Sequence, residues 1–377
     1  MTLPSKELSP LRFVIVGEAW GEHEERAMQA FFGPAGQELS RQLYDVGLDR
    51  KNCLLTNVIQ QRPPNNELKN ICLMRGAAVA TYARVRPELV ARWPDFDWPH
   101  TYNWPPLTRP GGFLHPEFLG ELARLRAEIL AFQPPLVIAL GNTACWGLLR
   151  VAGIGKLRGY IYPCTLVPGY KVLPTYHPAS ILRQYSNRPL VLADLAKAMR
   201  LASPSEALQT TLRRGAERVL WIEPTVEDLS AWWSRYVLRP DIRLSVDIET
   251  FAGTITCIGF GTTEGAISIP LWDRHKADGN YWSVEDEQRV MAEVFRWLTS
   301  PNPKVLQNAI YDLQYIWKTW GIRPRNVAAD TMLLHHALMP EMAKDLNFLG
   351  ATYSDVPAWK QLRRLSDAAL KKGKKDA

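Results

Sequence analysis

The sequence is poor in the features that mark secreted, disulfide-rich or membrane-spanning chains. Its five cysteines are scattered without a C-x-x-C pair, and each lies among apolar neighbours, as buried free thiols commonly do. No run of 18 apolar residues occurs, and the N-terminus lacks a basic stretch followed by an apolar one. We therefore expect a protein of a reducing cytoplasm, with no secretion signal and no membrane contact.

Net positive charge is also small outside one segment. The net charge is +7 and the isoelectric point is near 9.1, which invites a nucleic-acid interpretation because Lys and Arg displace counterions from phosphate. Residues 360–377 carry +5 of this charge, however, so only +2 remains for the rest. Bulk charge therefore does not identify a DNA-binding protein, and the tail is either a flexible phosphate contact or a solubilising terminus.

The length indicates two hydrophobic cores. With 377 residues and 46% apolar content, the chain exceeds the usual size of a single core and has enough material for two. A turn-rich stretch and a Trp-rich helix around residues 203–241 suggest a junction. We predict a first domain over residues 1–202, a linker over 203–241, a second domain over 242–359 and a basic tail over 360–377.

Strand and helix patterns alternate through the first domain. An apolar strand at residues 12–16 ends at Gly17, and the helix that follows ends at Gly47. Further strands are predicted at 53–58, 136–140 and 171–173, and further helices at 121–132, 143–150 and 189–201. This alternation is typical of an α/β fold with a mainly parallel sheet covered on both faces. Its ligand site is expected at the carboxyl ends of the strands.

The periodicity fails between Pro87 and Pro116, where prolines and the tryptophans Trp93, Trp98 and Trp104 gather. Such a segment is an insertion or a long loop. Its indoles either stack on unpaired bases or pin the loop to the surface of the domain.

Polar motifs follow the predicted strands of the first domain in a fixed order. They are Gly17-Glu18-Ala19-Trp20-Gly21-Glu22-His23-Glu24, Phe31-Phe32-Gly33-Pro34-Ala35-Gly36, Thr56-Asn57-Val58, Arg62-Pro63-Pro64, Arg158-Gly159 and Thr175-Tyr176-His177-Pro178-Ala179. In this order they resemble the uracil-DNA glycosylase superfamily, and within it the family-four enzymes of bacteria and archaea. The resemblance covers residues 12–200 and implies a three-layer domain with a parallel sheet.

The resemblance also implies roles for individual residues. Phe31 would stack on a flipped uracil, Asn57 would read its edge, and His177 would hydrogen-bond the oxygen on which negative charge develops. Glu18 and Glu24 would position the attacking water and offset positive charge on the sugar. The loop after His177, ending in Arg183, would lie along the DNA.

Three departures from the family pattern matter. Gln61 stands where one cysteine of an iron-sulfur cluster is expected, and no N-terminal cysteine pair exists, so we predict that no cluster forms. Trp20 replaces the usual proline beside Glu18, where an indole would narrow or block the pocket. An inactive, DNA-gripping domain therefore remains an alternative to a working glycosylase.

The second domain carries acidic residues at a spacing typical of nucleases. Asp247 and Glu249 lie two apart on a predicted strand, so both carboxylates point to one face, as two-metal phosphodiester hydrolysis requires. Strands at 243–247, 254–260 and 266–270 precede a helix at 285–298. Asn308 then leads into a helix that carries Asp312, with its apolar side expected at Ile310, Leu313, Ile316 and Trp317.

This arrangement, with Asp330-Thr331-Met332-Leu333 and Lys344-Asp345-Leu346-Asn347-Phe348-Leu349, resembles the DnaQ-like 3′–5′ exonuclease domain of family A DNA polymerases. The resemblance implies an RNase H-like fold with a mixed sheet. It also implies that Asp247, Glu249 and Asp312 hold two Mg²⁺ or Mn²⁺ ions and that Asn308 contacts DNA. Asp330 is interpreted as a helix cap rather than a ligand.

One family motif is absent from the second domain. A fourth acid is expected in a Tyr-x-x-x-Asp motif, but neither Asp355 nor Asp367 has a tyrosine four residues before it. Either a polymerase segment outside this chain supplies the acid, or Asp367 substitutes for it, or the nuclease is weakened.

The two resemblances together predict a DNA-processing protein of a phage-type replication system, located in the host cytoplasm if a phage encodes it. It would act on single-stranded or primer-template DNA, as the N-terminal part or a subunit of a family A DNA polymerase. The alternative is a noncatalytic DNA-binding accessory module of a polymerase, with both sites degenerate. That module would bind DNA in a salt-sensitive way even after loss of Asp247 and His177.

Overall fold

A computed structural model gives the fold over residues 8–92, 104–108, 111–203 and 219–354. Trp93, Trp98, Asp355, Asp367 and the basic tail lie outside these described residues. The chain divides into two compact units. Unit 1 comprises Met1–Leu208 and Gly350–Ala377, and unit 2 comprises Gln209–Leu349. No helix among the described residues is long and apolar enough to cross a membrane.

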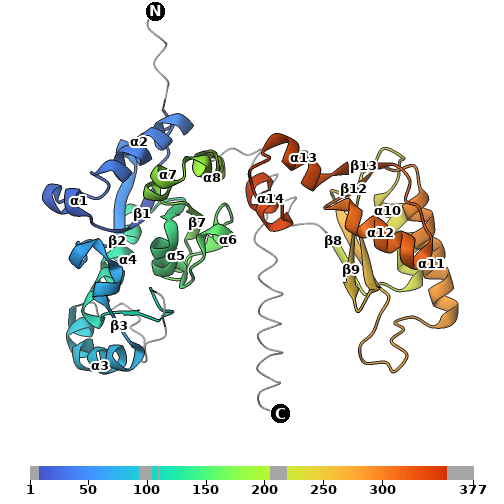
Figure 1. Cartoon of the computed structure of the whole chain (residues 1–377), viewed down its shortest axis with the longest axis horizontal. Coiled ribbons are helices and arrows are strands. Elements are labelled where there is room, and N and C mark those ends of the chain that lie inside the picture. The colour runs from blue at the N-terminus through green and yellow to red at the C-terminus, as the bar shows by residue number, and fades with distance from the viewer. Residues whose placement is uncertain (1–7, 93–103, 109–110, 204–218, 355–377) are drawn as a thin grey trace, which may run out of the picture. The chain divides into compact units, whose positions relative to one another are not determined.

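The part of unit 1 drawn from blue to green in Figure 1 contains a five-stranded sheet, whose strand order is β2-β1-β5-β7-β6. The first four strands of this order are parallel, and β6 is antiparallel to β7. The strands are β1 (Val14–Ala19), β2 (Leu54–Ile59), β5 (Val137–Leu140), β6 (Tyr162–Pro163) and β7 (Lys171–Thr175), with a separate pair β3 (Cys72–Leu73) and β4 (Phe113–Leu114).

Eight α-helices and five short 3₁₀ helices accompany the strands in the described part of unit 1. The α-helices are α1 (Glu22–Ala27), α2 (Pro34–Val46), α3 (Arg75–Arg92), α4 (Gly120–Phe132), α5 (Gly141–Leu149), α6 (Ile154–Leu157), α7 (Pro178–Arg183) and α8 (Arg188–Ala202). The 3₁₀ helices are η1 (Arg50–Asn52), η2 (Pro64–Asn66), η3 (Leu68–Ile71), η4 (Pro116–Phe118) and η5 (Tyr185–Asn187). As predicted, α2 ends at Gly47, which caps it in the left-handed conformation.

Hydrophobic side chains on both faces of this sheet make it the middle of three layers. Alternate residues along β1 point to opposite faces, so Phe13 and Ile15 join one core and Val14 and Val16 join the other. The first core is completed by α2 and α8 through Leu39, Leu43, Val191 and Leu195. The second is completed by α4 and α5 through Leu122, Leu125, Ile129 and Trp146. The predicted parallel three-layer architecture is confirmed.

The predicted insertion between Pro87 and Pro116 begins later than expected. Helix α3 continues through Pro87 to Arg92, because it buries Ala78, Tyr82 and Leu89 on one side and this packing outweighs the proline. Trp104 is buried against Trp146, at a centroid distance of 5.2 Å. For this indole, the interpretation as a pin holding the loop to the domain is therefore confirmed.

Unit 2 contains a six-stranded mixed sheet in the order β13-β12-β9-β10-β11-β8. β9, β10 and β11 are antiparallel neighbours, whereas β12 and β13 join β9 in parallel. The strands are β8 (Val219–Ile222), β9 (Leu244–Phe251), β10 (Thr254–Gly261), β11 (Gly265–Pro270), β12 (Lys304–Leu306) and β13 (Val327–Asp330). An antiparallel meander extended by two parallel strands is the RNase H-like arrangement, which confirms the predicted fold class.

The helices of unit 2 are α10 (Val226–Tyr236), α11 (Val284–Thr299), α12 (Ala309–Trp320) and α13 (Thr331–Leu338), and α14 (Leu346–Tyr353) crosses into unit 1. Residues 219–236, part of the stretch that the sequence suggests as a junction, form β8 and α10, and α10 is the expected Trp-rich helix. They belong to the fold because Trp232 is fully buried against Trp297 of α11.

One predicted helix face in unit 2 is wrong. Ile310 and Trp317 were expected on the apolar side of α12, but they are exposed, and the helix buries Ala309, Asp312 and Ile316. The spacing of three and four residues still defines one face. That face includes the carboxylate of Asp312, which a prediction based on hydrophobicity alone would place in solvent.

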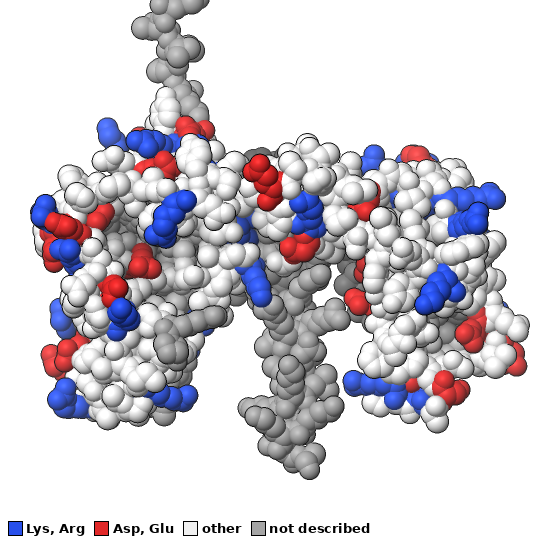
Figure 2. All heavy atoms as spheres, viewed as in Figure 1, with Lys and Arg blue, Asp and Glu red and all other residues white. Residues whose placement is uncertain are grey.

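Charge is mixed on the face of the described residues that Figure 2 draws. On the face drawn in Figure 2, acidic and basic side chains alternate over both units and form no continuous basic stripe. This agrees with the small net charge of the chain before the basic tail.

Candidate active sites

Three of the predicted residues in unit 1 converge at the carboxyl ends of the parallel strands. The rings of Phe31 and His177 stack at a centroid distance of 5.9 Å and an angle of 28°. A Cβ at Gly17 would lie 2.3 Å from Asn57 Oδ1 and 2.5 Å from Phe31 Cζ, so Asn57 and Phe31 meet above this glycine. Gly17 is required here because any side chain would displace both residues.

His177 is held as a neutral donor. It caps α7, where its Nδ1 accepts a hydrogen bond from the backbone N–H of Ala179 at 3.1 Å. Burial, assisted by the charge of Arg183 and opposed by Glu24, lowers the pKa of His177 to about 4. The ring is therefore neutral near pH 7 with its proton on Nε2, which suits donation to an oxygen that gains negative charge.

The first turn of α5 lies beside two of the predicted residues. Gly141, at a φ of +84°, leaves so little room that a Cβ there would lie 3.1 Å from His177 Cβ. Two residues later, the Thr143 hydroxyl donates to Glu18 Oε2 at 2.7 Å. Thr143 was missed by the sequence reasoning, since it lies 125 residues from Glu18 and belongs to no recognised motif.

Glu24 makes backbone contacts within the loops that surround Phe31. Its two carboxylate oxygens accept from the N–H of Gly21 at 3.2 Å and of Gly33 at 2.9 Å. The side chain thereby ties the start of α1 to the start of α2, on either side of Phe31 in the sequence. Its observed contacts are those of a loop anchor.

Phe31 adopts an unusual backbone conformation that its neighbours hold in place. Its φ is +57°, and its carbonyl accepts from Arg50 Nη2 at 2.9 Å. Arg50 Nη1 also donates to the carbonyl of Gly36 at 2.9 Å, so one guanidinium joins the Phe31 turn to α2. Arg50, too, was not found from the sequence.

Two further positions in unit 1 bear on the predicted departures. Trp20 is half-buried, and its indole N–H has no acceptor within the described part of the chain. Gln61 is exposed just after β2. Arg183 ends α7 and is exposed, and its charge acts on the pKa of His177.

In unit 2, two of the predicted acids lie on β9 and the third lies on α12, in contact with β9. Asp247 and Glu249 alternate with the buried Val246 and Ile248, so they share the other face of the strand. Asp312 is buried on α12, and its Oδ1 accepts from the backbone N–H of Ile248 at 3.0 Å. Desolvation raises the pKa of Asp312 to about 6, and the charge of Asp247 adds to this effect.

Asp330 serves as a helix cap, as predicted. One of its oxygens accepts from Met332 N at 2.8 Å at the start of α13. Its carboxylate also accepts from the N–H groups of Asn308 and Ala309, at the start of α12. Asn308 itself is exposed at a φ of +58°. A single acid thus fixes the beginnings of both helices.

The acids of unit 2 are oxygen donors of the kind that Mg²⁺ and Mn²⁺ prefer, and the raised pKa of Asp312 reflects a carboxylate that an added cation would stabilise. Within the described residues, however, no three His, Cys, Asp or Glu side chains are grouped closely enough to hold a metal ion. The donor chemistry fits a metal, but the described geometry does not form a complete site.

A parallel three-layer α/β unit with these motifs at its strand ends is characteristic of a base-excising enzyme family. Residues 7–200 match the family described as the uracil DNA glycosylase superfamily, and since this is just over half of the chain, the protein belongs to that superfamily. The type-4 uracil-DNA glycosylase of Thermotoga maritima is 30% identical over 191 residues, covering 50% of this chain and 76% of that protein. The enzyme of the same name from Saccharolobus solfataricus is 28% identical over 203 residues, covering 52% and 73%.

A second kind of relative covers more of the chain. The DNA polymerase of Bacillus phage SP01 is 24% identical over 244 residues, which is 63% of this chain but 21% of that protein. This alignment is longer than the superfamily region, so it extends outside residues 7–200.

Solved structures give weaker similarities. The catalytic core of RRP6 from Trypanosoma brucei has a TM-score of 0.28 and 20% identity, over 37% of this chain and 35% of that chain. Escherichia coli RNase D has a TM-score of 0.23 and 16% identity, over 31% and 28%. The protein thus spans about a third of these solved chains.

Proposed function

We propose that unit 1 excises uracil from DNA by hydrolysing the N-glycosidic bond. The observation that carries this proposal is that Asn57 and Phe31 meet above Gly17, with a neutral His177 stacked on Phe31. An aromatic face, an amide and an imidazole donor are what recognition of a flipped pyrimidine needs. The similarity to type-4 uracil-DNA glycosylases supports uracil as the base.

In this proposal each residue has a distinct task. Phe31 stacks on the base and Asn57 reads its edge. His177 donates its Nε2–H to the uracil oxygen as negative charge develops there. Glu18, held by Thr143, orients the water and offsets positive charge on the sugar. Glu24 keeps the loops around Phe31 in place, and Arg183 contacts the DNA.

The test is uracil release from a single-stranded oligonucleotide that contains one uracil, followed by alkali to cleave at abasic sites. We expect an alkali-dependent break with the wild-type chain and about a 100- to 1,000-fold slower reaction with His177→Ala, the usual cost of losing one such donor. If the wild-type protein binds this DNA but produces no break, unit 1 binds DNA without excising uracil.

We further propose that unit 2 is a metal-dependent 3′–5′ exonuclease. Asp247, Glu249 and Asp312 would hold Mg²⁺ or Mn²⁺, which activates water and stabilises the charge that develops on the phosphate during hydrolysis. The shared face of Asp247 and Glu249, and the effect of Asp247 on the pKa of Asp312, support this assignment. Asn308 would contact the DNA near the acids.

Digestion of a 5′-labelled primer tests this second activity. A ladder of shortened products should appear with Mg²⁺, vanish with EDTA and be lost in Asp247→Ala. The same preparation of Asp247→Ala should still release uracil, which shows that the substitution leaves the chain folded. A ladder that survives Asp247→Ala would assign the nuclease to other residues or to a contaminant.

The alignment with a phage DNA polymerase supports a place in a replication system, as part or as a subunit of a family A polymerase acting on primer-template DNA. A noncatalytic role for unit 2 is the second candidate, favoured by the lack of a grouped set of three acids within the described residues. It predicts salt-sensitive DNA binding that Asp247→Ala leaves unchanged, together with no primer digestion.

A further inference from the structure

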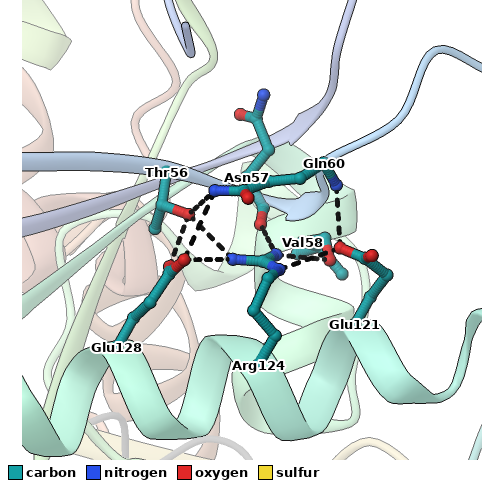
Figure 3. A network of polar contacts seen from close by, with 7 residues as sticks. All are labelled: Thr56, Asn57, Val58, Gln60, Glu121, Arg124 and Glu128. Carbon is teal, nitrogen blue, oxygen red and sulfur yellow. Dashed lines mark hydrogen bonds and ion pairs between the residues drawn. The ribbon is translucent and has the colours of Figure 1, made fainter. Parts of the chain in front are cut away.

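A network of polar side chains joins α4 to the end of β2, directly behind the base-reading Asn57 (Figure 3). Arg124 lies at its centre and donates from all three of its nitrogens. Nε contacts Glu121 at 2.9 Å, Nη1 contacts Glu128 at 2.7 Å and the Thr56 hydroxyl at 3.2 Å, and Nη2 contacts the carbonyls of Asn57 at 2.6 Å and Val58 at 3.2 Å. These five contacts match the five N–H donors of a guanidinium, so its orientation is fully determined.

The two glutamates fix the network to both α4 and β2. Glu121 also accepts from the backbone N–H of Gln60 at 2.9 Å, and Glu128 also accepts from the Thr56 hydroxyl at 2.7 Å. The Arg124, Glu121 and Glu128 side chains are each only 15–26% exposed, which shields the ion pairs from solvent. Residues 56 to 60 are thereby held as one rigid segment.

This segment needs support from outside the sheet. β2 is the edge strand of its sheet and pairs only with β1 among the described strands, so strand pairing holds it on one side alone. On that side Gly17 is the partner of Asn57, and the Asn57 amide is buried above it. Arg124 holds the carbonyl of the same residue through Nη2.

We propose that Arg124 is a positioning residue that fixes the Asn57 amide and thereby sets the preference for uracil over cytosine. This inference rests on the proposed glycosylase function. The edges of the two bases differ, because uracil presents an acceptor at the position where cytosine presents an amino donor. A fixed backbone keeps the Asn57 amide at one distance and angle from the base edge, whereas a mobile backbone would let the amide shift until it satisfies either pattern.

Arg124→Lys provides the test, since it keeps the positive charge but loses the fork that reaches Glu121, Glu128 and two carbonyls together. For the full chain we expect kcat/KM for uracil release to fall about 100-fold, the cost of an ångström-scale misplacement. The ratio of uracil to cytosine excision should fall about tenfold. Arg126→Met, on the same helix but outside the network, should stay within about twofold of wild type.

A second measurement separates this inference from the proposed glycosylase function. Free uracil is titrated into the full chain while the Asn57 side-chain amide is followed by NMR, which needs no catalysis. A shift of this resonance in wild type that is absent or much smaller in Arg124→Lys supports the positioning role, even in a chain that excises nothing. A folded Arg124→Lys with wild-type uracil binding and unchanged base preference would overturn the role. A wild-type chain that neither binds nor excises uracil would overturn both proposals.

Discussion

At the scale of single residues, the surroundings of His177 lower its pKa far enough to keep the ring neutral near pH 7. Its pKa near 4 results first from burial and then from the positive charge of Arg183. Because this pKa lies below the ordinary value of 6.5, the unfolded chain binds more protons on this residue between about pH 4 and 6.5. The contribution of His177 to stability is therefore present above pH 6.5 and is lost as the pH falls through about 4.

The Arg183→Met variant tests this electrostatic contribution. Removing the nearby charge should raise the pKa of His177 toward 6.5, so the acid limb of uracil release should move to higher pH. An NMR titration of the ring protons, assigned with His177→Ala, measures the pKa directly. Arg41→Met, which removes an exposed charge from α2, should leave it unmoved. A wild-type pKa close to 6.5 would contradict the assigned environment.

The pKa of Asp312 is shifted in the opposite direction from that of His177. Its pKa is raised to about 6, so between pH 3.8 and 6 the folded protein keeps a proton that the unfolded chain releases. Stability from this residue therefore decreases as the pH rises through that window. In metal-free protein, Asp247→Asn should lower the pKa of Asp312, because it removes a neighbouring negative charge. Carboxyl-carbon NMR measures the shift, and an unchanged pKa would place Asp247 too far away to share a cation with Asp312.

At the scale of elements, the turn at Phe31 and the first turn of α2 depend on one glycine. A Cβ at Gly36 would lie 1.7 Å from the carbonyl oxygen of Phe31, a backbone atom that cannot move aside without displacing the turn. Gly36→Ala should destabilise this region by about 1–3 kcal/mol, as overpacking usually does. Hydrogen exchange over residues 34–46 should speed up accordingly, and uracil release should weaken as Phe31 shifts.

A matched control exists in α3. A Cβ at Gly76 would meet no atom within 4 Å, so Gly76→Ala fills open space and should be neutral or should stabilise the helix by about 0.5–1 kcal/mol. If the two substitutions change stability equally, helix propensity rather than contact with Phe31 determines the effect of Gly36→Ala.

The elements also show which features of the structure could be predicted from the sequence alone. Periodicity located β1, β2, β5, β7 and the meander of β9, β10 and β11, but not the short strands β3, β4, β6, β8, β12 and β13. The period of two placed Asp247 and Glu249 on one face of β9. It could not find Arg124, whose contacts to β2 cross 66 to 68 residues of chain, although glutamates three residues before it and four after it were a visible signal of a helix-face network. Loop contacts were equally hidden, since the bonds from Glu24 to Gly21 and Gly33 depend on the backbone path.

At the scale of the whole molecule, the chain returns to unit 1 after completing unit 2. Residues 350–354 pack against a buried ionic group of unit 1 in which Arg158 pairs with Asp194 and Lys197 lies close by. The Lys197 ammonium donates to the carbonyls of Gly159, Ala351 and Ser354, and Arg158 donates to the Thr352 hydroxyl. Stability of unit 1 therefore depends on a segment that lies more than 140 residues further along the chain.

Deleting residues 350–377 should consequently destabilise unit 1. The deletion takes two carbonyl acceptors from the buried Lys197 ammonium. Removing partners of a buried charge typically costs a few kcal/mol, or about 5–10 °C in unfolding temperature for a unit of this size. Deleting only residues 355–377 keeps these acceptors and should change the temperature by no more than about 2 °C. Lys197→Met in the longer deletion should recover part of the loss, because it removes a buried charge that has lost two of its carbonyl acceptors. If both deletions unfold alike, the segment 350–354 contributes nothing to unit 1, and the first domain would be independent of the chain that follows it.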